Sequence, residues 1–415
     1  MNEKIDIVVV GGGPCGSFSA FTAARLGAEV SVFEEHSEIG VPKHCTGHLS
    51  IAGLKRLGLR LPHGIVENEF KGAIFHSPSG KKFVIRRASP VTCVVNRELF
   101  DKYVSNLAMK SGARYFLESR VKSFLFDSGF VAGVAFRKGR VEKSLASNIV
   151  IDAEGCSSTL LKRTELQTLD KFMVVNAVQA EVGRVDEVDL DMVEVYLGRK
   201  YAPGFFAWII PKRDASAKIG LAAKTGNPLE YLHQFLRKHP VASKKLRESD
   251  ITNLSVHPIP LGGPIPRTYS NGLLVVGDAA SQVKPTTGGG VIVGLSGSKI
   301  AGEVAYEAVK KNDFSEATLS QYQSRWKELI GFDLAVMRQT RKLLNRLNDR
   351  KIDKIVDLCG KLGVDSVLEE AGDLDFQGRS LIRVIKHPTA LIVALYFIFS
   401  SLGFSKPAIS PEKII

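Results

Sequence analysis

The first stretch whose residue types could do chemistry is the run GGGPCG, Gly11–Gly16, which follows six mostly β-branched or apolar residues. Its G-x-G-x-x-G spacing, between a predicted strand and a predicted helix, is typical of a loop that binds the pyrophosphate of a dinucleotide. Gly11 would permit the tight turn, Gly13 would let the backbone approach the phosphates, and Gly16 would allow close packing of helix on strand. Glu34, at the end of the next predicted strand, is expected to accept hydrogen bonds from the ribose hydroxyls.

A second stretch lies far downstream, where the hydrophobic residues 272–276 end in Gly277-Asp278 and the glycine-rich run 285–290 follows. A carboxylate beside the uncapped start of a helix would bind a second polar part of the same ligand. We therefore expect one dinucleotide site built from two distant parts of the chain.

A third stretch is the loop Pro42–Ser50, in which Cys45 is flanked by Lys43, His44 and His48. Basic neighbours can adjust the protonation of a thiol. The thiol could then gate, orient or donate a proton. A buried, inert cysteine is the alternative.

The elements that must position these residues are predicted from hydrophobic patterns. Ile5–Val10 and Glu29–Glu34 read as buried strands around a helix from Pro14 to Leu26. This βαβ start predicts an α/β, Rossmann-like fold with a parallel sheet. Further helices are expected over residues 97–111 and 288–310, and strands over 113–116, 130–136, 148–151 and 272–276.

Between Met173 and Ala223 the pattern changes to β-rich segments separated by charged turns, which predicts an antiparallel sheet. After Asp313 it is mostly helical through Leu368, with loops expected at Gly372 and Gly378. The predicted domains are a discontinuous dinucleotide-binding domain (1–65, 93–165 and 267–312), an antiparallel β substrate domain (66–92 and 166–266) and a mostly helical C-terminal region (313–415).

The segment Thr389–Leu402 is nearly all apolar, but it is shorter than the ~20 residues needed to span a bilayer. Two interpretations stay open, a buried core helix and an edge that dips into the membrane interface.

The net charge of +13 suits a polyanion, an anionic membrane or a phosphorylated substrate. The basic residues are scattered and not interleaved with aromatic ones, which argues against nucleic-acid binding. The five cysteines show no metal-ligand spacing, so no metal site is predicted, and they read as reduced thiols in the cytoplasm. A strand begins within the first five residues, so no signal peptide is expected.

Together, the two glycine-rich stretches resemble the FAD-dependent hydroxylase superfamily. The resemblance implies FAD as the cofactor, with Asp278 at the ribityl hydroxyls and the following helix start at the flavin ring. The superfamily's middle motif has a counterpart in residues 151–158, IDAEGCSS, where Glu154 stands in place of the usual aspartate. This departure weakens the case for NADPH as the direct donor, and an acidic turn after a buried strand is an equal interpretation.

Two further stretches resemble the geranylgeranyl reductase family, which includes archaeal digeranylgeranylglycerophospholipid reductases. Pro203–Pro211 resembles the family pattern P-x-x-Y-x-W-x-F-P, with Phe206 for Tyr and Ile210 for Phe. The loop around Cys45 resembles its C-x-G-x-x-S pattern. The aromatic stretch would be the wall of an apolar tunnel, or otherwise a core strand between prolines.

The resemblance implies a set of site residues. Arg97 would reach the phosphate or ribose of FAD, a surface salt bridge being the alternative. The implied cofactor contacts are Gly11, Gly13, Cys15, Gly16, Glu34, Cys45, Thr46, Gly47, Arg97, Val121, Asp278, Gly290 and Val291; the substrate contacts are Phe206 and Trp208; Cys45 is the catalytic candidate.

The implied activity is a reductase that uses FADH2 to saturate geranylgeranyl chains of isoprenoid lipids, holding an alkene carbon near flavin N5 while an acid protonates the other carbon. Its implied partners are the lipid, an external electron donor of the NAD(P)H or ferredoxin class, and a membrane touched peripherally from the cytoplasm. The alternatives are a flavin monooxygenase acting on an aromatic or quinone-type substrate, and a non-catalytic lipid carrier.

Overall fold

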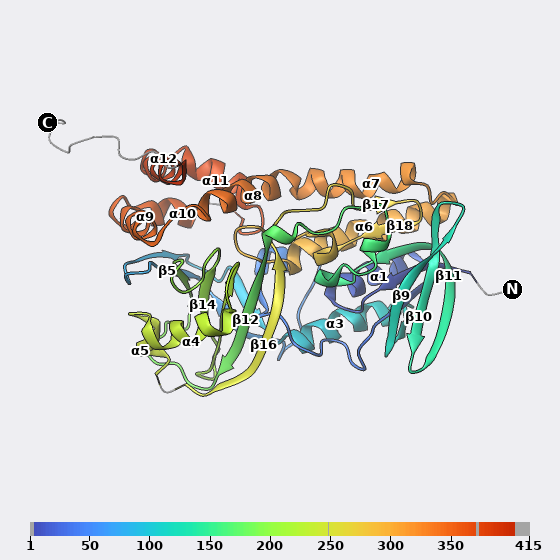
Figure 1. The fold of residues 1–415 in the computed structure, drawn as a ribbon, viewed down its shortest axis with the longest axis horizontal. Helices are drawn as coiled ribbons and strands as arrows, with labels where there is room; N and C mark the ends of the chain where they lie inside the picture. The colour runs from blue at the N-terminus through green and yellow to red at the C-terminus, as the bar shows by residue number, and fades with distance from the viewer. Residues whose placement is uncertain (1–3, 248, 371–372, 403–415) are drawn as a thin grey trace.

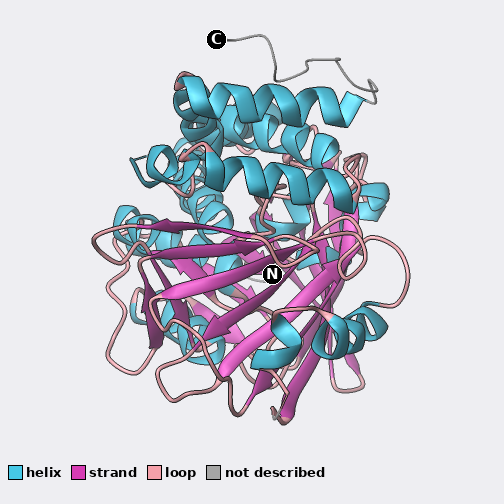
Figure 2. Ribbon diagram, turned by 90° about the vertical axis from the view of Figure 1, so that its left-hand side faces the viewer, coloured by secondary structure: helices cyan, strands magenta, loops and turns pink. Residues whose placement is uncertain are grey.

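The computed structural model describes residues 4–247, 249–370 and 373–402 of the 415-residue chain. Figure 1 shows an α/β part with helices α1, α3 and α6, a strand-rich part around β12 and β16, and a row of helices from α7 to α12 along one side. Figure 2 shows that the C-terminal helices lie as a layer over the strands. The predicted α/β fold class is confirmed.

The first sheet is built on the βαβ unit that the sequence predicts. Strand β1 (Ile5–Val10) pairs in parallel with β2 (Val30–Phe33) and with β11 (Val141–Asp152), and helix α1 (Pro14–Leu26) connects β1 to β2. Both helix ends match the prediction. Pro14 begins the helix, and Gly27, at φ 109°, closes it with a left-handed cap.

The remaining elements of this part surround those strands. The sheet order is β17-β18-β11-β1-β2-β8, and β9 and β10 extend from β11 as an antiparallel ribbon. The bounds are β8 (Arg114–Phe116), β9 (Ser119–Asp127), β10 (Phe130–Lys138), β17 (Tyr269–Ser270), β18 (Leu273–Val275), α3 (Arg97–Lys110) and α6 (Val291–Lys311).

Strand β11 is longer than the predicted 148–151. Only its last residues are buried in the parallel sheet, whereas its first residues are exposed in the ribbon with β10. The buried end alone produced a hydrophobic run in the sequence.

The second sheet has seven strands in the order β16-β12-β15-β14-β13-β5-β6. Its members are β16 (Ile251–Pro260), β12 (Val174–Val182), β15 (Ala217–Ala223), β14 (Phe206–Pro211), β13 (Met192–Leu197), β5 (Gly72–His76) and β6 (Lys82–Arg86). The pairings among β12 to β16 are antiparallel as predicted, but β13 pairs with β5 in parallel. Strand β5 comes from a much earlier part of the chain, so no local sequence pattern could predict that it runs parallel to β13.

Strand β14 is buried on both faces. Ala207 and Ile209 pack in the core beneath helix α4 (Pro228–Lys238), whereas Phe206, Trp208 and Ile210 pack on the opposite side. Because side chains alternate along a strand, the aromatic residues share one face. A small third sheet of β3 (His48–Ser50), β7 (Thr92–Val95) and β4 (Val66–Phe70) lies next to the Cys45 loop in sequence.

The C-terminal region is helical, as predicted. It contains α7 (Glu316–Trp326), a π-helical turn (Lys327–Gly331), α8 (Phe332–Leu344), α9 (Asp349–Lys361), α10 (Val364–Glu370), α11 (Gln377–Ile385) and α12 (Pro388–Leu402). The loop predicted at Gly378 is wrong, because Gly378 lies inside α11. A Cβ there would come within 2.8 Å of Asp333 Cα on α8, so this glycine serves close helix packing and not a turn. Gly372 lies outside the described residues.

Candidate active site

One large cavity, with a volume of about 1070 Å³, extends from the Gly11–Gly16 loop past β14 to the C-terminal helices. Every residue that the sequence predicted for the site lines this cavity. The structure therefore brings together the two glycine-rich stretches, the cysteine loop and the aromatic strand. The role of each residue there stays a prediction.

The three glycines of the first loop meet different constraints. Gly11 has φ +95°, and a Cβ on it would lie 2.5 Å from the Ala153 carbonyl oxygen; a Cβ on Gly16 would lie 1.9 Å from the Gly11 carbonyl oxygen. These two glycines are required by the protein's own packing. At Gly13, by contrast, no described atom lies within 4 Å of a Cβ. The space beside Gly13 belongs to the cavity, and a side chain there would fill it.

Two helices begin at this cavity with free backbone N–H groups. Helix α1 is preceded by Gly13 and helix α6 by Gly290; as described, neither start has a side-chain cap or an acidic residue in its first turn. Uncapped helix starts carry partial positive charge and bind phosphate or other electron-rich groups. This pair fits both ends of a dinucleotide, so the residues present match the implied FAD.

Glu34 holds the shape of the glycine loop. One carboxylate oxygen accepts a hydrogen bond from the Gly12 N–H at 2.7 Å, and the other accepts one from the His36 N–H at 3.0 Å and contacts His36 Nδ1 at 2.6 Å. Its carboxylate also lines the cavity. The contact with a ribose stays a prediction, because the observed partners belong to the protein.

Arg97 lies in the wall of the cavity at the start of α3, which Asn96 caps. Its guanidinium forms a salt bridge with Asp101 at 3.0 Å, with side chains only 11% and 9% exposed, and Cys45 lies near enough to interact with its charge. Burial alone would lower the pKa of Arg97, but the charge of Asp101, the nearby Cys45 and the hydrogen bonds to Asp101 raise it above its ordinary value. Arg97 therefore forms a salt bridge, as the alternative interpretation expects, but the pair is largely buried and does not lie on the surface.

The cysteine loop is bound to both the three-stranded and the seven-stranded sheet. Thr46 donates to Gln179 Oε1 at 2.9 Å, Lys218 Nζ donates to the Thr46 carbonyl at 3.2 Å, and Gly47 has φ +79° in contact with Val95. Cys45 itself is half-buried.

The basic residues that flank Cys45 in sequence have other partners. Lys43 pairs with Glu98 at 3.2 Å, and His48 contacts Thr92 Oγ1 at 2.8 Å. Burial and, secondarily, the charge of Lys284 lower the pKa of His48 to about 4, so it stays neutral. The cation near the thiol is Arg97, which is distant from Cys45 in the sequence, so the residues flanking Cys45 did not predict it.

Sequence reasoning also missed a cluster around Asp278. Cys156 Sγ lies 3.4 Å from Asp278 Oδ2, and ligand-type atoms of Cys156, His257 and Asp278 all lie within 4.8 Å of one another. The His257 ring stacks on His44 with centroids 5.1 Å apart. Burial and the charge of Asp278 raise the pKa of the Cys156 thiol, which favours a neutral hydrogen-bond donor over a metal-binding thiolate.

Three of the other predicted cofactor contacts, Cys15, Val121 and Val291, have no reactive group available for chemistry. Cys15 is half-buried, with its Sγ packed against Gly277, and desolvation raises the pKa of its thiol to about 12. The thiol of Cys15 is therefore a packing group. Val121 lies on β9, and Val291 is the first residue of α6.

The aromatic wall consists of three rings. Phe205 and Phe206 stack with centroids 4.2 Å apart, and Phe206 meets Trp208 edge-on at 6.1 Å. Trp208 is 8% exposed, and its indole N–H has no partner among the described residues. This wall is largely apolar, as the predicted tunnel requires.

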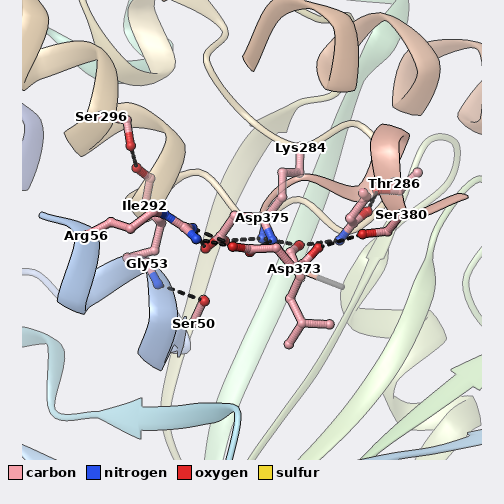
Figure 3. A network of polar contacts seen from close by, with 12 residues as sticks. Ser50, Gly53, Arg56, Lys284, Thr286, Ile292, Ser296, Asp373, Asp375 and Ser380 are labelled. Carbon is pink, nitrogen blue, oxygen red and sulfur yellow. Dashed lines mark hydrogen bonds and ion pairs between the residues drawn. The ribbon is translucent and has the colours of Figure 1, made fainter. Parts of the chain in front are cut away.

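The C-terminal region binds the loop before α6 through ion pairs and hydrogen bonds. Figure 3 shows Lys284 and Arg56 converging on Asp375, at 3.1 Å and 2.6 Å, while Arg56 also contacts Asp373. Asp375 is only 2% exposed. Arg341 on α8 donates to the carbonyls of Pro285 at 2.8 Å and Thr286, and burial lowers its pKa to about 10.

We expect Asp375→Ala to lower the free energy of unfolding by about 3–5 kcal/mol, because Lys284 and Arg56 lose their shared buried partner. Thermal unfolding would measure this loss. Asp373→Ala removes a carboxylate that is 25% exposed and should cost much less. Equal losses at the two positions would contradict the assignment of Asp375 as the centre of the network.

Comparison with known proteins identifies the family of the chain. A model of the lycopene cyclase protein family matches residues 6–358. A digeranylgeranylglycerophospholipid reductase from Methanocaldococcus jannaschii is 34% identical over 363 residues, 87% of this chain and 92% of the relative. A second, from Methanopyrus kandleri, is 31% identical over 92% of this chain and 99% of the relative.

Solved structures with a similar fold include a reductase-like protein. A geranylgeranyl bacteriochlorophyll reductase-like protein from Thermoplasma acidophilum has a TM-score of 0.85 at 27% identity, covering 95% of this chain and 99% of its own. A flavin-dependent brominase has a TM-score of 0.66 at 19% identity over 86% of this chain and 94% of its own, which shows a shared fold alone. From matches that extend over most of its length, the chain belongs to the family of digeranylgeranylglycerophospholipid reductases.

Proposed function

We propose that this chain is an FAD-dependent reductase that saturates double bonds in the geranylgeranyl chains of isoprenoid membrane lipids. One observation carries the proposal: a single cavity joins two uncapped helix starts, suited to a dinucleotide, to an apolar aromatic wall. The names of the relatives support the substrate class.

The cofactor end of the cavity has a role for each predicted group. The N–H groups of α1 would hold the pyrophosphate beside Gly13, Glu34 would contact the adenosine ribose, and Asp278 would accept hydrogen bonds from the ribityl hydroxyls. The N–H groups at the start of α6, beside Gly290, would stabilise negative charge on the flavin. Bound FAD, once reduced, would supply the hydride.

The substrate end orients the prenyl chain and excludes water. Phe206 and Trp208 would pack against the prenyl chain, and Cys45, which lies near Arg97 in the same cavity, would donate the proton to the alkene. An external donor of the NAD(P)H or ferredoxin class reduces the flavin, and the enzyme touches the membrane peripherally from the cytoplasm.

The decisive test uses flavin-loaded enzyme reduced with dithionite and mixed with geranylgeranyl lipids dispersed in detergent. A reductase adds two hydrogens per double bond, which mass spectrometry of the lipid resolves. Addition of oxygen after exposure to air would instead support the monooxygenase, and an unchanged lipid bound to the protein would support a carrier.

We expect Trp208→Ala to raise KM for the lipid or to change which double bond is reduced, while FAD stays bound. Loss of this buried ring also costs ~3–5 kcal/mol of stability, so Trp208→Phe is the milder companion. Ile209→Ala is the matched control, because its side chain packs on the opposite face of β14. If Ile209→Ala altered KM as strongly as Trp208→Ala, Trp208 would be excluded from the substrate site.

A further inference from the structure

Helix α12 is apolar on two opposite faces. Its inward face is buried at Ala390, Val393, Ser400 and Ser401, and Phe397 lines the cavity. Its outward face carries six exposed large apolar side chains: Leu391, Ile392, Leu395, Ile398, Phe399 and Leu402, each 38–52% exposed. Their spacing follows one side of an α-helix. Of the two interpretations of this segment, a fully buried core helix is therefore wrong.

The two C-terminal helices are basic in sequence. Residues 377–402, which form α11 and α12, contain Arg379, Arg383 and Lys386 and no acidic residue. All three are exposed, as is the apolar Ile382 between them, and Arg379 is paired with Asp333 at 3.3 Å. An exposed apolar stripe close in sequence to exposed cations is typical of a segment that lies in the interface of an anionic membrane.

The length of α12 fits lying on a bilayer better than crossing it. Its 15 residues extend about 22 Å, against about 30 Å for a hydrocarbon core. Within the described part of the chain, no single helix is long and apolar enough to span a membrane; α11 and α12 would qualify only as a pair, and they are bent by 111°.

The cavity reaches this helix. At its far end it is lined by apolar side chains of α9, α11 and α12, among them Ile355, Val384 and Phe397. The same helix thus has the cavity on one side and an exposed apolar stripe on the other. A prenyl chain passing from a bilayer to the aromatic wall would meet a mostly apolar lining.

We propose that α12 docks on the surface of an anionic bilayer through this stripe, and that the prenyl chain of a membrane lipid enters the cavity beneath it. The entry route rests on the proposed function, whereas the docking does not. A bilayer is favoured over a protein partner because the stripe carries no polar groups for a specific interface, Arg383 and Lys386 are exposed in the residues just before α12, and the cavity behind it suits a lipid chain.

The test replaces three outward residues, Ile392→Ser, Ile398→Ser and Phe399→Ser, in one full-length, flavin-loaded variant. The matched control replaces three exposed apolar residues of the β9–β11 ribbon, Phe126→Ser, Phe130→Ser and Val141→Ser. Binding is measured by co-sedimentation with vesicles of phosphatidylcholine and phosphatidylglycerol. Reduction is measured on a geranylgeranyl lipid placed either in those vesicles or in detergent micelles.

The α12 variant should bind vesicles at least about tenfold more weakly, since three partly inserted apolar side chains are lost. Its turnover should fall by a similar factor on vesicle-embedded lipid and stay at the parent level in micelles. The control should match the parent throughout. Parent-like binding by the α12 variant would overturn the docking, and undiminished turnover on vesicles despite lost binding would overturn the entry route. Failure of the parent to reduce the lipid in micelles would count against the proposed function and leave the binding result to decide the docking.

Discussion

Replacing Gly13 by valine is expected to produce a folded protein that purifies with little or no flavin. In the structure, Gly13 has φ −65°, which any residue adopts, and its Cβ position faces open space. The valine is therefore tolerated by the protein but intrudes where the pyrophosphate is proposed to lie. Overpacking of this kind costs ~1–3 kcal/mol, which corresponds to roughly a fivefold to 150-fold loss of FAD affinity.

Flavin absorbance per chain and a fluorescence titration of apoprotein with FAD would measure the loss. Gly183→Val is the matched control, because Gly183 also has open space at its Cβ and has no positive φ. This control should keep its flavin. Gly16→Ala should instead fail to fold, since its Cβ would lie 1.9 Å from a carbonyl oxygen. A Gly13→Val protein with normal FAD affinity would show that the cofactor is misplaced.

The parts of the fold that the sequence predicted well are those with local, one-dimensional signals. Strand β1, helix α1 and strand β2 combine a buried hydrophobic run with a proline start and a glycine stop, and the predicted helix ends were confirmed. The glycine loop was identified for the same reason, because its spacing and its flanking elements are contiguous.

The features that sequence reasoning missed depend on contacts between distant segments. The parallel pairing of β5 with β13 joins residues more than a hundred positions apart, and the Arg97 cation beside Cys45 comes from a different element. The loop predicted at Gly378 is wrong for the same reason, because this glycine lies in α11 and allows that helix to pack closely against Asp333 of α8. Likewise, an apolar pattern cannot tell whether the two faces of α12 meet protein or solvent.

Cys45→Ala is expected to retain FAD and its reduction by dithionite, yet to transfer hydride to the lipid slowly. If the thiol delivers the proton to the alkene, single-turnover reoxidation by substrate should slow by ~10²–10⁴-fold, the usual contribution of a general acid. A loss of only a few-fold would indicate packing or gating by the loop. Cys45→Ser keeps a small hydroxyl donor in place and should recover part of the rate under the acid role but none under a role that requires the thiol's size.

The control for this prediction is Cys93→Ala, on strand β7 next to the same loop. Cys93 is 2% exposed, does not line the cavity, and burial raises the pKa of its thiol to about 12, so it takes no part in chemistry. Its replacement removes one buried sulfur and therefore reports the cost of a packing defect near the site. Hydride transfer in Cys93→Ala should stay close to that of the parent even if its melting temperature falls. Cys45 differs from Cys93 because it lines the cofactor cavity and lies near the Arg97 cation. Equal slowing at both cysteines would mean that the measurement followed stability, and the proton-donor role of Cys45 would have to be withdrawn.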